Sequence, residues 1–106
     1  MISEERLSKA LTYLAETDEK CAKAKAYYMG LDEQTKTIKA GEFLKHDGTV
    51  AEREATAYAS NAYREHLEKV QNANADYETM RNKRLTEELI VEVWRSLNSQ
   101  RRKGNL

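Results

Sequence analysis

The chain contains no proline in 106 residues, and this absence constrains its fold more than any other feature. Proline ends or kinks a helix because it lacks a backbone N–H and its ring clashes with the preceding turn. Without proline, two stretches, about 3–45 and about 61–100, have helical character with little interruption. Each would be on the order of 60 Å long at 1.5 Å per residue. We therefore predict an all-α fold, a long antiparallel helical hairpin that forms a single helical domain over residues 1–106.

The only strong turn lies between these stretches, at residues 46–49, where Asp47 precedes Gly48. Thr49 and Glu52 have the spacing of a capping box, which predicts a short connecting helix over about residues 50–58. Ser60 and the following asparagine offer a fresh helix cap, so a break or a bend is expected before the second long helix. Gly30 and Gly41 are the positions where the first helix could kink or end. Residues 101–106 are predicted to form a frayed basic tail.

Apolar residues recur at helical spacing along both long stretches, and the core that they can form is thin. Hydrophobic residues make up 40% of the chain, with one Phe and one Trp. Two helices that bury one side each rarely form a sufficient core. We therefore expect self-association into a multi-helix homo-oligomer, a dimer or a higher assembly. The second stripe is Tyr63, Leu67, Val70, Ala73, Tyr77, Met80, Leu85, Leu89, Val93 and Leu97. The predicted protein interface lies at its end and consists of Leu89, Ile90, Val93, Trp94 and Leu97.

Residues that carry enzyme chemistry are scarce. The two histidines, His46 and His66, belong to no metal-binding motif, and Cys21 is the only cysteine. The four glycines never cluster, so no phosphate-binding loop of a known type is present. We predict a protein that is not an enzyme, with no catalytic residue, no metal and no cofactor. His66 is expected to be a partly exposed helix residue.

Positive charge is concentrated near the end of the chain, although the formal net charge is zero. Residues 81–106 carry 7 basic and 3 acidic groups, which gives +4. This segment predicts a possible nucleic-acid contact, since basic side chains on a helix can neutralise phosphates. The alternative is that basic residues complement the dipole at a helix C-terminus. The candidate contact residues are Arg81, Arg84, Arg95, Arg101, Arg102 and Lys103.

The sequence also bears on the compartment. A lone cysteine forms no intrachain disulfide, and the N-terminal residues lack the basic and apolar regions of a secretory signal. No apolar stretch approaches the roughly 20 residues of a membrane span. These features favour the cytoplasm, with no membrane partner.

Three segments together resemble a known group of proteins. They are residues 10–18 (ALTYLAETD), residues 49–55 (TVAEREA) leading to Tyr63, and residues 91–97 (VEVWRSL). In this order they resemble small uncharacterised helical proteins of tailed bacteriophages and prophages, often encoded among early genes for DNA recombination or replication. The resemblance implies an accessory or modulator of such proteins in the bacterial host cytoplasm, binding another phage or host protein. The alternatives are direct nucleic-acid binding by the basic C-terminal helix and inhibition of a host defence enzyme.

Overall fold

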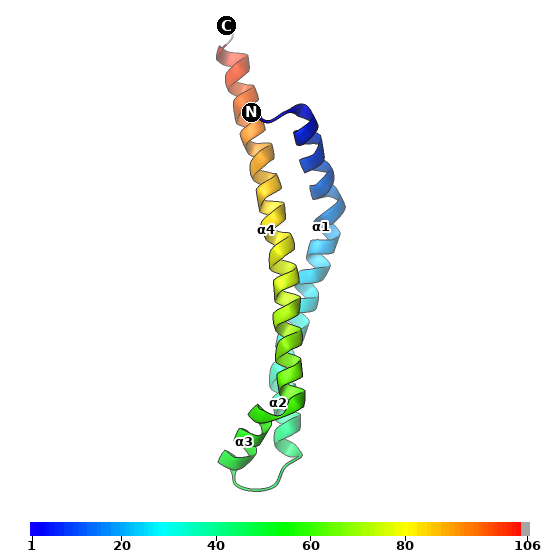
Figure 1. Ribbon diagram of the computed structural model, residues 1–106, viewed down its shortest axis with the longest axis vertical. Helices are drawn as coiled ribbons and strands as arrows, with labels where there is room; N and C mark the ends of the chain where they lie inside the picture. The colour runs from blue at the N-terminus through cyan, green and yellow to red at the C-terminus, as the bar shows by residue number, and fades with distance from the viewer. Residues whose placement is uncertain (105–106) are drawn as a thin grey trace. The chain divides into compact units, whose positions relative to one another are not determined.

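The computed structural model describes residues 1–104, which form four helices and contain no β-strand (Figure 1). They are α1 (Glu4–Glu33), α2 (Thr35–Leu44), α3 (Val50–Ala59) and α4 (Asn61–Gly104). The all-helical prediction is thus confirmed for this part of the chain. Two compact units make up the described chain, and each is treated separately below. The predictions of a single domain and of an oligomer remain predictions.

Three helices begin where a hydroxyl side chain accepts a backbone N–H. Ser3 Oγ accepts from the amide of Arg6 at 3.0 Å, at the start of α1. Thr49 Oγ1 accepts from the amide of Glu52, whose carboxylate accepts from the Thr49 amide, both at 3.2 Å. The predicted capping box is therefore present. Ser60 Oγ accepts from the amide of Tyr63, so α3 and α4 are separated by a break at Ser60 and not by a bend.

The structure differs from the predicted helix limits at two places. The first long helix is interrupted at Gln34, between α1 and α2, whereas Gly30 and Gly41 both lie inside helices. The Gln34 amide donates to Leu31 O, three residues back, which tightens this turn. At the other end α4 continues through Gly104, so residues 101–104 of the predicted frayed tail are helical. Residues 105–106 of that tail lie outside the described residues.

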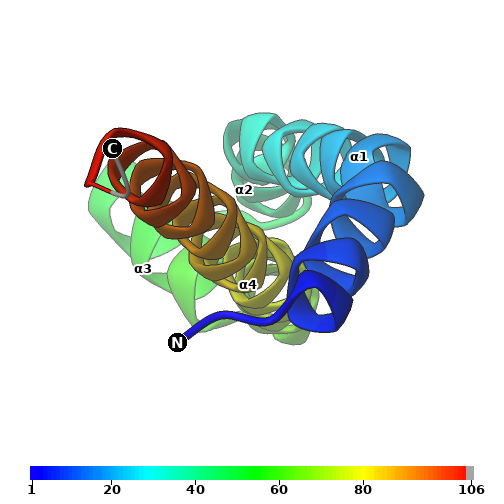
Figure 2. The ribbon, with the colours of Figure 1, turned by 90° about the horizontal axis from the view of Figure 1, so that it is seen from above.

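The first unit contains residues 1–22 and 78–104, in which the start of α1 lies antiparallel to the end of α4. Arg6 contacts Glu87, and Thr17 contacts Arg84, so residue numbers rise along one helix as they fall along the other. Ala10 is fully buried between these contacts. The chain before α1 leads toward α4 (Figure 2), where Met1 Sδ lies 3.8 Å from Arg101 Nη2.

The second unit contains residues 23–77, in which α3 packs against α2. The guanidinium of Arg53 lies over the Phe43 ring at 4.4 Å from its centroid. Lys39 Nζ donates to the Tyr58 hydroxyl and also contacts the face of that ring. The hydrogen bond to Tyr58 raises the pKa of Lys39 above its usual value of 10.5. These contacts hold the short α3 in place, because a ten-residue helix is marginal alone.

Tyrosines stack within the second unit as well. Tyr58 meets Tyr63 edge to face, with ring centroids 5.5 Å apart, and links α3 to the start of α4. Tyr28 stacks with Tyr77 at 6.4 Å, which joins α1 to α4. Such pairs contribute about 0.5–1.5 kcal/mol each beyond their buried area. Stacked tyrosines therefore supply part of the packing that a chain with one Phe cannot obtain from larger apolar residues.

Very little apolar surface is fully buried in the part of the chain that the structure describes. Ala10 and Ala57 are its only buried apolar residues, and no large side chain in it is fully enclosed. The buried positions include polar ones, among them Thr17, Glu42 and Glu87. The thin core predicted from composition is thus what the structure shows. None of the described helices has the length and apolar character needed to cross a membrane.

Candidate interaction surface

A row of partly exposed apolar residues lies in the second half of α4, between residues 85 and 97. Its members are Leu85, Leu89, Val93 and Leu97, each four residues after the one before. They remain 48%, 63%, 39% and 37% exposed, respectively. We call these four residues the α4 apolar row. Most large apolar side chains of a folded protein lose nearly all of their contact with water, so a continuous row of this kind is characteristic of a binding surface.

The row is exposed because α1 packs against a different side of α4. The inward positions of this segment are Arg84, Glu87, Ile90, Val91, Trp94 and Asn98, all buried or half-buried. Successive members of the row are four residues apart and are therefore rotated by 400° on a helix of 3.6 residues per turn. Each member thus lies about 40° further around the helix than the one before. The leucines at residues 85 and 89 therefore lie away from the side that faces α1.

The contact between α1 and α4 contains a buried ion pair at a position where an apolar side chain such as leucine would be usual. Glu87 is only 8% exposed, and Arg6 Nη2 donates to both of its carboxylate oxygens, at 2.8 and 2.7 Å. A carboxylate removed from water needs such a partner to remain charged without a large cost. The ion pair therefore fixes the register of α1 on α4 in this unit.

Arg84 makes a second polar contact between the same helices. Its Nη1 donates to Leu14 O at 2.7 Å and to Thr17 Oγ1 at 2.6 Å, and its Nη2 donates to Asp18 at 3.3 Å. The side chain is 16% exposed. Arg84 was predicted as a nucleic-acid contact. In the structure its donors are directed to α1, so they contribute to packing.

The other predicted basic residues are distributed along α4. Arg81 pairs with Glu78 at 3.4 Å, and Arg95 pairs with Glu92 at 3.2 Å, each within the helix. Arg101 lies against Met1. The last turn adds the exposed side chains Arg102 and Lys103. The basic residues therefore cluster at the end of α4. They do not form a continuous stripe that reaches back to residue 81.

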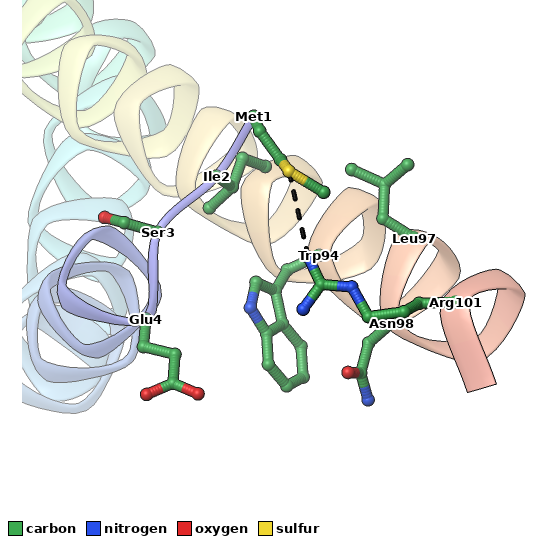
Figure 3. Close-up of a pocket in the computed structure, with 8 residues that line it drawn as sticks. All are labelled: Met1, Ile2, Ser3, Glu4, Trp94, Leu97, Asn98 and Arg101. Atoms are coloured by element: carbon green, nitrogen blue, oxygen red, sulfur yellow. Dashed lines mark hydrogen bonds between the residues drawn. The ribbon is translucent and has the colours of Figure 1, made fainter. Parts of the chain in front are cut away.

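The predicted protein interface divides between two sides of α4. Leu89, Val93 and Leu97 belong to the α4 apolar row, whereas Ile90 and Trp94 are half-buried. Figure 3 shows the indole of Trp94 near the N-terminal residues. Together they line a hollow of about 370 Å³. Leu97 also lines this hollow. Met1 borders this hollow and is itself 94% exposed. The tryptophan is thus partly covered by the protein's own N-terminal segment.

Two features were not found from sequence. Leu85 was assigned to the apolar stripe and not to the predicted interface, and it is exposed beside Leu89, four residues along the helix. The expectation for His66 was wrong, because this residue is only 6% exposed and its Nε2 lies 3.1 Å from Thr35 Oγ1. Within residues 1–104, no cluster of three or more His, Cys, Asp or Glu side chains forms a candidate metal site.

No protein-family model, curated protein or solved structure matches the chain.

Proposed function

We propose that this protein is a non-enzymatic helical interaction protein that self-associates through the α4 apolar row. The observation that carries the proposal is the partial exposure of Leu85, Leu89, Val93 and Leu97, while a buried ion pair lies in the neighbouring helix interface. Burying one such side chain contributes about 1.5–3 kcal/mol. A second apolar surface would therefore gain several kcal/mol by covering the row.

Light scattering with gel filtration tests the self-association. We expect the wild-type protein to elute as a dimer or higher oligomer at micromolar concentration, and Leu89→Lys to shift it to monomer. Leu44→Lys is the matched control, because Leu44 is 73% exposed and lies on α2, outside the row. A wild-type monomer across the accessible concentration range would reject the proposal, as would equal effects of the two substitutions.

The cellular role that we propose is accessory: modulation of phage or host proteins that act in DNA recombination or replication. The likeness of three helical segments to phage and prophage proteins supports this role. Immobilised protein should bind saturably to at least one member of a panel comprising a recombinase, a strand-annealing protein and a single-strand-binding protein. Lack of binding to every member would remove this role and leave self-association standing.

Direct nucleic-acid binding is a second candidate, favoured by the basic last turn of α4. Arg101, Arg102 and Lys103 follow one another there. Fluorescence anisotropy with labelled single- and double-stranded DNA at about 50 mM salt would detect such contacts. Binding should weaken in Arg102→Gln/Lys103→Gln and should decline steeply with salt. The absence of binding at low salt would exclude this candidate.

A further inference from the structure

We infer that the hollow beside Trp94 binds a single strand of nucleic acid, with an unpaired base stacked on the indole and a neighbouring phosphate held by Arg101 and Arg102. This inference rests on the second candidate function, direct nucleic-acid binding, and adds the site and the kind of strand. Three observations lead to it: the position of the hollow on α4, the side chains that converge in it, and the positive charge beside it.

The hollow lies where α4 continues past the beginning of α1 (Figure 1). It is lined by residues 1–4 and by Trp94, Leu97, Asn98 and Arg101 of α4. Trp94, Asn98 and Arg101 fall within a sector of about 60° at 100° per residue, and Glu87 lies in the same sector. At Glu87 this side of α4 is covered by Arg6 of α1. The hollow is therefore the part of the packing side of α4 that helix α1 does not reach.

The hollow suits a flat aromatic group. Its volume of about 370 Å³ falls within the roughly 300–1,000 Å³ of small-molecule sites. Trp94 is half-buried, so its ring is held against the protein while part of it lines the hollow. Bases stack on such a ring whatever their identity, because every base has a π face.

Two polar side chains accompany the indole. Asn98 lies four residues after Trp94, about 6 Å along the axis, and its amide can donate to and accept from a base edge. Side chains of a helix lean toward its N-terminus, so Arg101 reaches back over the turn that leads to Trp94. Figure 3 shows the indole, the amide and the guanidinium together around the hollow. They provide a stacking surface, a group for the base edge and a group for phosphate.

The positive charge beside the hollow is available to a ligand. The arginines at residues 81, 84 and 95 each pair with a carboxylate. No carboxylate of residues 1–104 pairs with Arg101, Arg102 or Lys103. Arg102 lies about 40° beyond Asn98 around the helix, whereas Lys103 lies opposite Trp94. A strand that leaves the hollow toward Arg102 thus meets a second guanidinium, a group that binds phosphate through two donors.

Glu4 is the acidic residue among the described residues that line the hollow. In the view of Figure 3 its carboxylate and the guanidinium of Arg101 lie at opposite sides of the indole. A base on the indole therefore separates a phosphate at Arg101 from this carboxylate.

The site and the α4 apolar row occupy different sides of the helix. Leu89 and Val93 lie about 100–140° from Trp94 in one direction around α4, and Arg102 lies about 80° from it in the other. Only Leu97 belongs to both the row and the hollow. A strand that runs from Trp94 to Arg102 leads away from the row, so strand binding and self-association can be measured separately.

Tryptophan fluorescence tests the site directly, because Trp94 is the only tryptophan of the chain. An oligothymidylate of about ten nucleotides at about 50 mM salt should quench the fluorescence of the full chain saturably. A duplex of equal length should quench little, because its bases are already paired and stacked. Thymidine monophosphate should bind at least about tenfold more weakly, because it offers a single phosphate to the two arginines.

Substitutions separate the hollow from general charge. By fluorescence anisotropy, Trp94→Ala should weaken binding about 5- to 150-fold, which corresponds to the roughly 1–3 kcal/mol of one stacked base. Trp94→Phe should retain most of the affinity, because it keeps an aromatic ring. Arg101→Gln should weaken binding about 3- to 10-fold and reduce the salt slope by about 0.7. Arg95→Gln is the matched control, since it removes the same charge from the same helix outside the hollow.

The remaining outcomes distinguish the inference from the candidate function. Single-strand binding by anisotropy without quenching would overturn the hollow as the site and leave binding by the basic last turn standing. Equal losses in Arg95→Gln and Arg101→Gln, or equal quenching by duplex and single strand, would do the same. Binding of thymidine monophosphate as tight as that of the oligomer would replace the strand with a free nucleotide. No binding of any of these probes would remove the candidate function together with the inference. Circular dichroism would establish that each variant folds.

Discussion

Gly48 is the residue whose backbone conformation matters most for the connection between α2 and α3. Its φ is +119°, and a Cβ at this position would collide with the carboxylate of Glu52. That carboxylate is half of the capping box that begins α3. One glycine therefore permits both the turn and the start of the next helix.

Substitution of alanine for two glycines should have opposite effects on stability. Gly48→Ala should lower the free energy of unfolding by about 1–3 kcal/mol, because of backbone strain and the lost cap. Gly41→Ala should raise it by about 0.5–1 kcal/mol, because a Cβ there meets open space within α2. Urea unfolding followed by circular dichroism measures both. Equal changes in the two variants would contradict this account of the turn.

The Arg6–Glu87 pair is unequal in its exposure, with side chains 38% and 11% exposed. Removal of the arginine leaves a carboxylate inside the helix interface, whereas removal of the carboxylate leaves an arginine that can turn toward water. We therefore expect Arg6→Met to destabilise the protein by about 1–3 kcal/mol and Glu87→Met to cost less. The double variant should be more stable than Arg6→Met alone. Thermal unfolding of the three variants decides this, and a larger loss in Glu87→Met would refute it.

At the scale of helices, α3 illustrates how a short element depends on its neighbours. It has ten residues, a capping box at its start and two aromatic contacts to the rest of its unit. Lys39 adds a hydrogen bond and a cation–π contact to Tyr58. Since the pKa of Lys39 is raised, this contribution is fully present below pH 10.5 and is lost as the pH rises through the folded-state pKa.

Loss of the Tyr58 ring should release α3 selectively. In Tyr58→Ala we expect amide hydrogen exchange in residues 50–59 to accelerate by about tenfold or more, because contacts to Lys39 and Tyr63 disappear. Exchange at Arg84 and Glu87, in the other unit, should change little. Tyr58→Phe is the matched control, as it keeps the ring and removes the hydroxyl. Unchanged exchange in Tyr58→Ala would show that the capping box alone holds the helix.

At the scale of the whole molecule, the balance between buried and exposed apolar surface is the main property. Packing within the units relies on alanines, stacked tyrosines and buried polar contacts, whereas four large apolar residues of α4 remain partly exposed. The proposed self-association would stabilise the folded protein, because a partner that binds only the folded chain shifts the folding equilibrium by mass action.

The unfolding temperature should therefore depend on protein concentration. We expect it to rise by several degrees between about 1 and 100 μM in the wild-type protein, since bound partners stabilise by RT ln(1 + [L]/Kd). Leu89→Lys should abolish the dependence, and Leu44→Lys should preserve it. Differential scanning calorimetry over this range provides the measurement, and an unfolding temperature independent of concentration in the wild-type protein would count against association.

The sequence alone determined the features that depend on neighbouring residues. The absence of proline, the caps at Thr49 and Ser60, and helical spacing predicted the helices and most of their limits, because capping and helix formation are local interactions. The interruption at Gln34 was not predicted, since this residue lacks a recognised stop signal. The burial of Glu87 was also not predicted, because a charged residue among the polar residues of a helix is normally exposed.

Only the tertiary structure decided which side of α4 faces α1. The apolar pattern favoured the side with Leu85 and Leu89, yet the paired helices bury Arg84 and Glu87. That choice depends on residues 67 to 81 positions apart in the chain, whose ion pair and hydrogen bonds exist only once the helices meet. The spacing of apolar residues identifies an apolar surface on a helix. Contacts between residues that are distant in the chain determine whether the chain itself covers that surface.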